Sequence, residues 1–228
     1  MTSSVVVTGA AGGIGRAVVT RLARNHHVVA TDVVAEVSEL GADNVTPVVA
    51  DVTSGHGRLE ILAAAKRALA GLVNVVGITR DSLVNKMSEH EMRQVLRVNA
   101  AGPIEMSLAA ADAMGSGGSI VQISSRSHLG NIGQVNYAAS KGALIGATQA
   151  LARTLAPRIR VNAIAPGLIQ TPMTDAMPPD VLDKLVGRIP RGRIGHPDDV
   201  AAMVAHLLSQ DADYVTGQTI YVCGGRSI

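Results

Sequence analysis

Tyr137 and Lys141 are the two side chains with the clearest chemistry in this sequence. They are four residues apart in a helical pattern, so both lie on one face of a helix. A tyrosine hydroxyl has an ordinary pKa of about 10, which is too high for acid–base work near neutral pH. Bringing it to about 7 requires roughly 4 kcal/mol of preferential stabilisation of the phenolate, which one ammonium at about 4 Å can supply. The pair therefore predicts a general acid/base acting on a substrate oxygen.

A glycine-rich turn near the start of the chain could hold phosphate. It contains Gly9, Gly12, Gly13 and Gly15, and it lies between a strand-like run and a helical pattern. Glycines let the backbone turn sharply and approach a pyrophosphate, whose charge is stabilised at a helix N-terminus. The spacing differs from G-x-G-x-x-G, and a ligand-free strand–helix turn is the alternative. The strand before the turn and the helix after it favour a dinucleotide site.

Asp32 ends the next strand-like run and bears on which dinucleotide is bound. A carboxylate at that place can accept hydrogen bonds from the hydroxyls of an adenosine ribose. It repels a 2′-phosphate by about 4 kcal/mol for two unit charges 4 Å apart at an effective dielectric of about 20. No base at Val33, Val34 or Gly12 offsets this repulsion, so the sequence favours NAD over NADP. A surface aspartate that merely ends a strand is the alternative.

Strands and helices must alternate to bring these residues together. The predicted strands are Ser4–Thr8, His27–Thr31, Val45–Ala50, Leu72–Val76, Ser119–Ser124, Arg160–Ala165 and Thr219–Val222. The predicted helices are Gly13–Arg24, Gly57–Leu69, Ser88–Met114, Asn136–Ala156 and Pro197–Ser209. The strand runs are almost continuously apolar, as in strands covered on both faces. The pattern predicts an α/β fold: a single Rossmann-type, doubly wound parallel sheet of about seven strands flanked by helices, with residues 1–228 as one domain.

The stretch 166–195 departs from the alternation. It is rich in proline and contains one short helical pattern, around Val181–Val186. A segment of that length between a late strand and the next helix often covers a site, and a solvated surface excursion is the alternative. We expect it to cover the substrate, in an apolar pocket lined by Leu129, Ile132, Leu168, Met173 and Met177.

Composition excludes several classes of function. The chain has 228 residues, of which 47% are hydrophobic and 17% charged, and its net charge of +2 is too small for a polybasic nucleic-acid surface. The absence of Phe and Trp argues against base stacking. The lone Cys223 excludes an intrachain disulfide, and no metal-ligand spacing occurs. No targeting or transmembrane pattern is found, so we expect a cytoplasmic protein that binds neither nucleic acid nor membrane.

Together these motifs resemble the short-chain dehydrogenase/reductase family, essentially from end to end. The resemblance is carried by the glycine turn, Asp32, Asp51-Val52, Asn99 within Arg-Val-Asn, the Tyr137–Lys141 pair and Pro166-Gly167-x-Ile169-x-Thr171. The stretches beginning at Gly77, Ile189 and Tyr214 resemble 3-oxoacyl-carrier-protein reductases in particular.

The resemblance implies a role for each matching residue. Tyr137 would donate a proton to a ketone or remove one from an alcohol, and Lys141 would lower its pKa and hold the nicotinamide ribose. Ser125, in preference to Ser124, would orient the substrate oxygen, and Asn99 would hold a water of a proton relay. Besides Tyr137 and Lys141, the cofactor contacts would be Gly9, Gly12, Gly13, Ile14, Gly15, Asp32, Asp51, Val52, Asn74, Gly77, Pro166, Gly167, Ile169 and Thr171.

Several features of the sequence depart from the family pattern, and three further residues have an expected place in the fold. The strand-end motif Asn74-Val75-Val76-Gly77 lacks its second Asn, and the chain is shorter than usual after Asp32, after Asp51 and before Ser119. The link 114–118 lacks a base, so carrier-protein docking is not favoured. His128 is expected at the rim of the pocket, His196 at a helix entry and Cys223 in the core.

The sequence therefore predicts an NAD(H)-dependent oxidoreductase that interconverts a ketone and a secondary alcohol, similar to a 3-oxoacyl thioester reductase. A dehydrogenase of a small or cyclic secondary alcohol is one alternative, and a non-catalytic NAD-binding sensor or scaffold is the alternative of another class. The resemblance also implies a homotetramer. Small residues on one helix would permit close packing between subunits: Gly142, Ala143, Gly146, Ala147 and Ala150.

Overall fold

A single twisted sheet organises the chain, whose computed structural model describes residues 3–171, 174 and 177–227. Within these residues, seven parallel strands pair in the order β3-β2-β1-β4-β5-β6-β7. Their bounds are β1 (Ser4–Thr8), β2 (His27–Asp32), β3 (Val45–Val49), β4 (Leu69–Asn74), β5 (Gly118–Ile123), β6 (Ile159–Pro166) and β7 (Thr219–Val222). The strand order reverses between β1 and β4, and doubly wound sheets bind ligands at such a point. The predicted fold class is confirmed.

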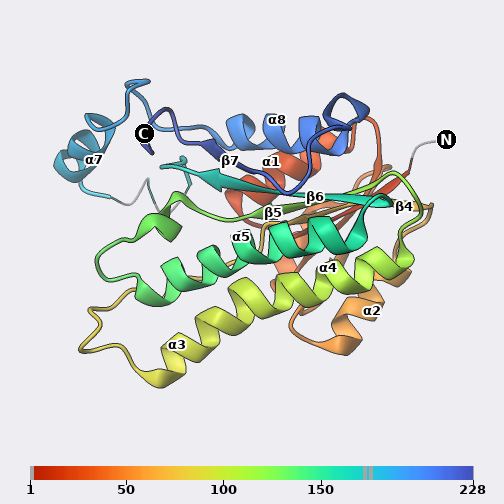
Figure 1. Cartoon of the computed structure of the whole chain (residues 1–228), viewed down its shortest axis with the longest axis horizontal. Helices are drawn as coiled ribbons and strands as arrows, with labels where there is room; N and C mark the ends of the chain where they lie inside the picture. Colours follow the sequence, from red (N-terminus) through yellow and green to blue (C-terminus); the bar gives the residue numbers. More distant parts are fainter. Residues whose placement is uncertain (1–2, 172–173, 175–176, 228) are drawn as a thin grey trace.

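Helices cover both faces of the sheet, with α1 and α8 on one face and α2, α4 and α5 on the other (Figure 1). Their bounds are α1 (Gly13–Leu22), α2 (Gly55–Ala63), α4 (Gly102–Ala113), α5 (Val135–Leu155) and α8 (Pro197–Leu208). Successive strand residues serve opposite layers, so that Val5 and Val7 pack in one core and Val6 in the other. None of the described helices combines the length and apolar character needed to cross a bilayer.

The predicted helix Ser88–Met114 is one long rod with a change of helix type in its middle. Ser88 caps α3 (Glu89–Leu96) through the capping box that the sequence indicates. A π-helical turn, Arg97–Ala101, then connects α3 to α4 without a break. Such turns are often found at functional sites, and this one contains Asn99.

Two predicted boundaries before β4 are wrong. The helix predicted over Gly57–Leu69 ends at Ala63, and the strand predicted over Leu72–Val76 instead begins at Leu69 and ends at Asn74. The alanines after Leu62 favour helix locally, but burial of the following residues against β1 makes them strand. Between β2 and β3, a short 3₁₀ helix, η1 (Ala35–Leu40), replaces a full α-helix, which agrees with the shortness of the chain after Asp32.

The stretch 166–195 leaves the end of β6 and returns beside its own start. The Gly195 amide donates to the Leu168 carbonyl (2.9 Å), and the Gln170 amide donates to the Gly195 carbonyl (2.8 Å). Between these points the chain forms α7 (Pro179–Val186), in agreement with the short helical pattern predicted there. In Figure 1, α7 lies at the end of the molecule where the chain terminates, opposite the N-terminus.

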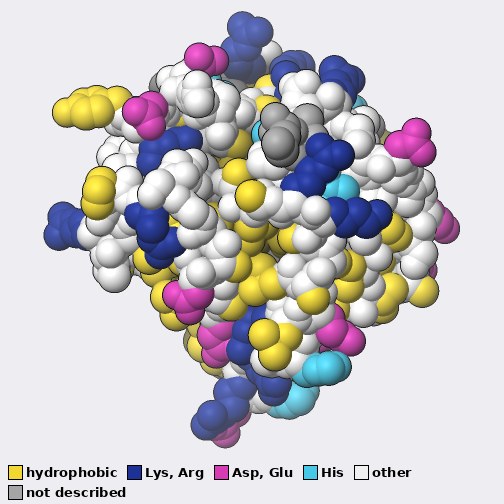
Figure 2. Space-filling model, turned by 90° about the vertical axis from the view of Figure 1, so that its right-hand side faces the viewer, with side chains coloured by type: hydrophobic (Ala, Val, Ile, Leu, Met, Phe, Trp, Pro, Cys, Tyr) yellow, Lys and Arg dark blue, Asp and Glu magenta, His cyan; other side chains and the backbone are white. Residues whose placement is uncertain are grey.

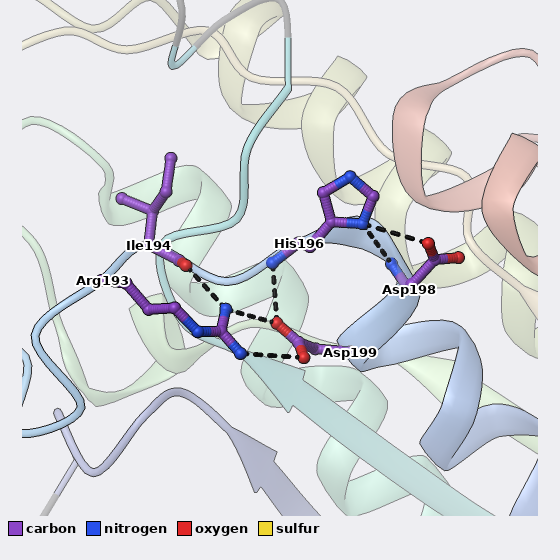
Figure 3. Close-up of polar contacts among 5 residues, drawn as sticks. All are labelled: Arg193, Ile194, His196, Asp198 and Asp199. Carbon is purple, nitrogen blue, oxygen red and sulfur yellow. Dashed lines mark hydrogen bonds and ion pairs between the residues drawn. The ribbon is translucent and has the colours of Figure 1, made fainter.

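A compact polar cluster opens α8 (Figure 3). His196 is the N-cap, as expected, and its ring accepts from the Asp198 amide (3.3 Å). Asp199 accepts from the His196 amide (2.7 Å) and from both terminal nitrogens of Arg193 (2.8 and 3.1 Å). The Arg193 guanidinium also donates to the Ile194 carbonyl (2.9 Å). These contacts, above all that with Arg193, lower the pKa of Asp199, so the stretch 166–195 ends on a fixed ion pair.

Candidate active site

Two adjoining cavities open at the carboxyl ends of the central strands. The first has a volume of about 620 Å³ and is lined by the glycine turn and by the residues that follow β2 and β4. The second has a volume of about 570 Å³ and contains Ser125, Tyr137 and Lys141. The two share the lining residues Ile14, Val75, Gly77, Ile78, Arg80 and Thr171. They therefore form one groove that passes from the glycine turn to the tyrosine.

The four glycines of the turn divide into two pairs. A Cβ on Gly9, whose φ is +65°, would lie 2.6 Å from the Val76 amide nitrogen, and one on Gly15 would lie 2.1 Å from the Gly9 carbonyl oxygen. These two are required by the chain's own packing. A Cβ on Gly12 or Gly13 would meet no atom closer than 3.6 or 3.4 Å, and both line the first cavity. This second pair forms an open cradle at the N-terminus of α1, where a pyrophosphate could bind.

Asp32 and Asp51 lie at the far side of the first cavity. Asp32 accepts from the Ala11 amide (3.1 Å) and from the Val33 amide (2.8 Å), which fixes its carboxylate at the end of β2. Asp51 accepts from the amide (2.8 Å) and hydroxyl (2.9 Å) of Thr53, and the adjacent Val52 is buried. All three predicted contacts, Asp32, Asp51 and Val52, line this cavity.

Asn74 lies below the groove instead of in its lining, which differs from the expected cofactor contact. Its side chain is buried, accepts from the Thr8 hydroxyl (3.2 Å), and donates to the Pro103 carbonyl (3.1 Å) and the Ser107 hydroxyl (3.0 Å). It also donates to the Gln122 amide oxygen (3.1 Å). These bonds join β1, β4, β5 and α4, so Asn74 positions the strand ends from which the groove residues depart.

Asn99 also acts through its neighbours. Its amide oxygen accepts from the Ile78 nitrogen (2.8 Å), and its amide nitrogen donates to the Ile78 carbonyl (2.8 Å) and the Ser140 hydroxyl (3.2 Å). Both amide hydrogens are therefore engaged within the protein. The side chain therefore fixes the loop after β4. A relay water could bind only to the second lone pair of the Asn99 amide oxygen or to the backbone of the π-helical turn.

The structure distinguishes the two serines. The Ser124 hydroxyl is buried and donates to the Lys141 carbonyl (2.8 Å), away from the cavity centre. The Ser125 side chain hydrogen-bonds the Tyr137 hydroxyl and accepts from the Ser127 amide (3.1 Å). Strand alternation turns one serine into the core and the other toward the tyrosine, and Ser125 is the one that faces it.

The electrostatics of the tyrosine–lysine pair differ from the expectation. Burial raises the pKa of Tyr137, and the hydrogen bond with Ser125 only partly offsets it, while Asp81 raises it further. The Lys141 ammonium donates to the Ile123 carbonyl (2.9 Å) and lies 5.8 Å from the centre of the tyrosine ring. Burial lowers the pKa of Lys141 to about 8. The lysine is thus turned toward β5, which explains why it does not lower the pKa of the phenol in this arrangement.

We expect the buried ammonium of Lys141 to give the protein a characteristic pH dependence of stability. Because its pKa falls from 10.5 to about 8 on folding, the unfolded chain binds more protons between those values. The free energy of unfolding should therefore rise from pH 8 toward pH 10 by up to about 3 kcal/mol. Below pH 8 the lysine is charged in both the folded and the unfolded state, so this gain in stability is absent there. Urea unfolding of wild type and Lys141→Met across pH 7 to 10 measures it. A rise of the same size in the variant would contradict this origin.

The remaining predicted contacts surround the second cavity. Pro166, Gly167, Ile169 and Thr171 all line it, and a Cβ on Gly167 would lie 2.8 Å from the Cys223 backbone. Of the expected apolar pocket, Leu168 and Met177 line the cavity, whereas Leu129 and Ile132 point to solvent, and Met173 lies outside the described residues.

Sequence reasoning missed several side chains of this lining. Those that matter for its charge and its cover are Arg80, Arg126, Leu185 of α7 and Arg226. The position of Arg126 directly after Ser125 was the one available signal. His128 hydrogen-bonds the Tyr221 hydroxyl (2.5 Å) and is not part of the lining, while Cys223 is half-buried at the end of β7 and does not belong to the core.

The chain is similar to known proteins over nearly its full length. A family model described as enoyl-(acyl carrier protein) reductase matches residues 9–227. A (3R)-3-hydroxyacyl-CoA dehydrogenase of Mus musculus is 42% identical over 244 residues, covering 96% of this chain and 94% of that protein. A 3-oxoacyl-acyl-carrier-protein reductase, FabG of Staphylococcus aureus, is 39% identical and covers 99% and 98%. A crystal structure from Brucella melitensis, titled as a short-chain dehydrogenase/reductase of the glucose/ribitol dehydrogenase kind, has a TM-score of 0.92 at 32% identity and full coverage of both chains.

Proposed function

Because this chain belongs to the short-chain dehydrogenase/reductase family, we propose that it is an NAD(H)-linked reductase of 3-oxoacyl thioesters that also oxidises the corresponding 3-hydroxyacyl thioesters. Family membership makes it a nicotinamide-dependent oxidoreductase that interconverts a ketone and a secondary alcohol of a small-molecule substrate. The observation that carries the proposal is the convergence of Ser125, Tyr137 and Lys141 on a cavity continuous with the glycine cradle. The thioester class is supported by the relatives named above.

The groove supplies each part of the proposed reaction. Gly12 and Gly13 would hold the pyrophosphate, Asp32 the adenosine ribose, and Ile169 and Thr171 the nicotinamide, which when bound donates or accepts the hydride. In the reducing direction, Tyr137 gives its hydroxyl proton to the substrate oxygen. Ser125 holds that oxygen by a hydrogen bond, so the carbonyl and the hydroxyl proton are aligned before transfer.

Lys141 and Asn99 support the proton donor without replacing it. The Lys141 ammonium would stabilise the phenolate left on Tyr137 once a ligand occupies the groove beside Gly77. A Cβ on Gly77 would lie 3.1 Å from the Lys141 nitrogen, so a side chain there would crowd the ammonium. Asn99 keeps the loop around Ile78 in place through the two hydrogen bonds described above.

The proposed preference for NAD rests on the charges beside Asp32. Val33 and Val34 are exposed and uncharged, so neither compensates the Asp32 carboxylate. The nearby Arg16 is engaged, because its guanidinium donates to the Ala11 carbonyl (2.9 Å) and pairs with Glu39 (3.4 Å). A 2′-phosphate would therefore meet the Asp32 carboxylate and a guanidinium that already has two partners, which disfavours NADP.

Replacing Asp32 with asparagine should reduce this preference. We expect kcat/KM for NADPH to rise about tenfold and that for NADH to fall about tenfold, since the repulsion and a charge-assisted hydrogen bond are lost together. Initial rates at 340 nm with both cofactors measure the ratio. Asp112→Asn, on the exposed side of α4, makes the same change in net charge far from the groove and should leave the ratio unchanged. An unaltered ratio in Asp32→Asn would contradict the assignment.

The proposed function is tested by oxidation of NADH against a small panel of substrates. The panel contains acetoacetyl-CoA, an acetoacetyl carrier protein, cyclic ketones and simple diketones, with the matching alcohols and NAD⁺ in the reverse direction. Turnover of acetoacetyl-CoA well above that of the cyclic ketones supports the proposal. Preferential turnover of the cyclic ketones and alcohols would overturn it in favour of a small-alcohol dehydrogenase. Binding of NADH without turnover of any member would favour a sensor.

We further propose that residues 1–228 act as one domain and that four copies assemble. Support for the assembly comes from α5, where a Cβ on Gly142 or Gly146 would meet no atom within 4 Å, so another helix could approach closely. The link 114–118 contains no base, and Arg158 is engaged with the carbonyls of Ala111 and Met114. We therefore propose free thioesters, not a carrier protein, as the substrates.

A further inference from the structure

The charge of the substrate cavity is one-sided. Its described lining contains four cationic side chains, Arg80, Arg126, Lys141 and Arg226, and no Asp or Glu. Lys141 belongs to the proton donor's surroundings, and Arg80 lies at the junction with the cofactor cavity. Arg126 and Arg226 remain without a task in the proposed reaction.

Arg126 is held in place by the C-terminal tail. It directly follows Ser125 and begins a 3₁₀ turn, η3 (Arg126–Leu129), at the cavity wall. Its Nε donates to the Ser227 hydroxyl (3.3 Å), and the same turn is joined to β7 through the hydrogen bond between His128 and Tyr221. Two connections to the end of the chain therefore hold Arg126 at the wall of the substrate cavity.

Arg226 approaches the same place from that tail. It is partly buried, and burial together with the neighbouring guanidiniums of Arg126 and Arg188 lowers its pKa. Across residues 3–171, 174 and 177–227, the ion pairs of arginine involve Arg16, Arg58, Arg93 and Arg193, and none involves Arg126, Arg188 or Arg226. Arg193 differs from these three, because it pairs with Asp199 (Figure 3).

The positive charges of Arg126 and Arg188 repel that of Arg226, and an anion bound beside Arg226 and Arg126 would relieve this repulsion. Guanidinium groups bind phosphate and carboxylate in a bidentate manner, and such charge-assisted hydrogen bonds are among the strongest in proteins. We propose that Arg126 and Arg226 form a subsite for an anionic group, a phosphate or a carboxylate, carried by the substrate away from its reacting ketone. This inference rests on the proposed function in that the reacting ketone occupies the same cavity.

Two substrate pairs distinguish the sources of the anion. Acetoacetyl-CoA and acetoacetyl-pantetheine differ by the phosphates of the nucleotide end, and acetoacetate and methyl acetoacetate differ by one carboxylate. We expect wild type to prefer the charged member of one pair, and Arg126→Gln/Arg226→Gln to raise its KM at least thirtyfold while changing the neutral member less than threefold. The substrate pair in which the double Gln variant loses the preference for the charged member identifies the source of the anion.

The controls separate a local contact from a general effect of charge. Arg126→Lys/Arg226→Lys should recover part of the lost affinity. Arg24→Gln removes a charge at the opposite end of the sheet, where it lines a separate cavity of about 590 Å³, and should change neither pair. Figure 2 shows that end of the molecule, where Lys and Arg side chains are interspersed with Asp and Glu. Equal losses for charged and neutral substrates in the double Gln variant would overturn the subsite.

A binding measurement keeps the two proposals apart. Calorimetric titration of CoA, and separately of acetoacetate, into the enzyme saturated with NAD⁺ should show at least one of them binding, with the affinity lost in the double Gln variant. If that holds while no thioester or keto acid is turned over, the subsite stands and the proposed function fails. If acetoacetyl-pantetheine is reduced normally but neither anion binds, the function stands and the subsite fails.

Discussion

Tyr137→Phe is expected to lower kcat at least a thousandfold while changing the affinity for NADH less than about twofold. The hydroxyl is the group that Ser125 aligns in the substrate cavity, and general acid catalysis contributes about 10²- to 10⁴-fold. The phenyl ring keeps the shape of the site, so binding of the dinucleotide in the adjoining cavity should persist. Steady-state rates at 340 nm and titration of NADH fluorescence measure the two effects.

Tyr214→Phe is the matched control, because Tyr214 is fully exposed on the surface loop before β7. It removes the same hydroxyl from a position remote from the groove and should leave kcat and NADH affinity unchanged. Retention of wild-type turnover by Tyr137→Phe would mean that another group donates the proton. A loss of NADH binding together with turnover would mean that the substitution disturbed the groove itself.

Gly9→Ala is expected to destabilise the protein by about 3 kcal/mol or more. The new methyl group would lie 2.6 Å from the Val76 nitrogen, which is backbone and cannot move aside, and alanine would have to adopt the left-handed φ of +65°. Both costs act at the point where β1 ends and the glycine turn begins. Urea unfolding followed by circular dichroism measures the change in the free energy of unfolding.

Gly12→Ala separates this steric cost from the effect on the ligand. Gly12 has a φ of −74°, and its Cβ would meet no atom closer than 3.6 Å, so stability should change by less than about 1 kcal/mol. The methyl group would instead occupy the cradle, and we expect the affinity for NADH to fall about tenfold. Equal destabilisation by the two substitutions would contradict the division of the turn into packing glycines and cradle glycines.

The fold could be predicted because its signals are local and repeated. Buried parallel strands such as β1 and β5 are continuous apolar runs, and the capping box at Ser88 and the helix entry at His196 are short motifs with one physical meaning. The start of β4 could not be predicted, because the alanines before it favour a helix. Only pairing with β1 makes the residues from Leu69 onward a strand.

The candidate site was predicted only in part, because local signals fix some of its residues and tertiary contacts fix the others. Residues that follow strands directly, such as Gly77 and Ser125, have positions fixed by the topology. The direction in which a long side chain extends is set by tertiary contacts, so the turn of Lys141 toward the Ile123 carbonyl could not be read from spacing. Arg226 lies in the C-terminal tail, a hundred residues after its spatial neighbour Arg126. No local sequence pattern predicts that these two residues lie close together.

The hydrogen-bonded network around Asn74 restricts which substitutions this sequence can accept. The Asn74 side-chain amide hydrogen-bonds Thr8, Ser107 and Gln122 at once, beneath the strand ends from which the groove residues depart. A change at any one position leaves a buried donor or acceptor without a partner, at a cost of about 1–3 kcal/mol, whereas a coordinated change can be nearly neutral. Substitutions at these positions are therefore epistatic, and homologous lineages should replace Asn74, Ser107 and Gln122 in step, through compensating pairs, more often than singly.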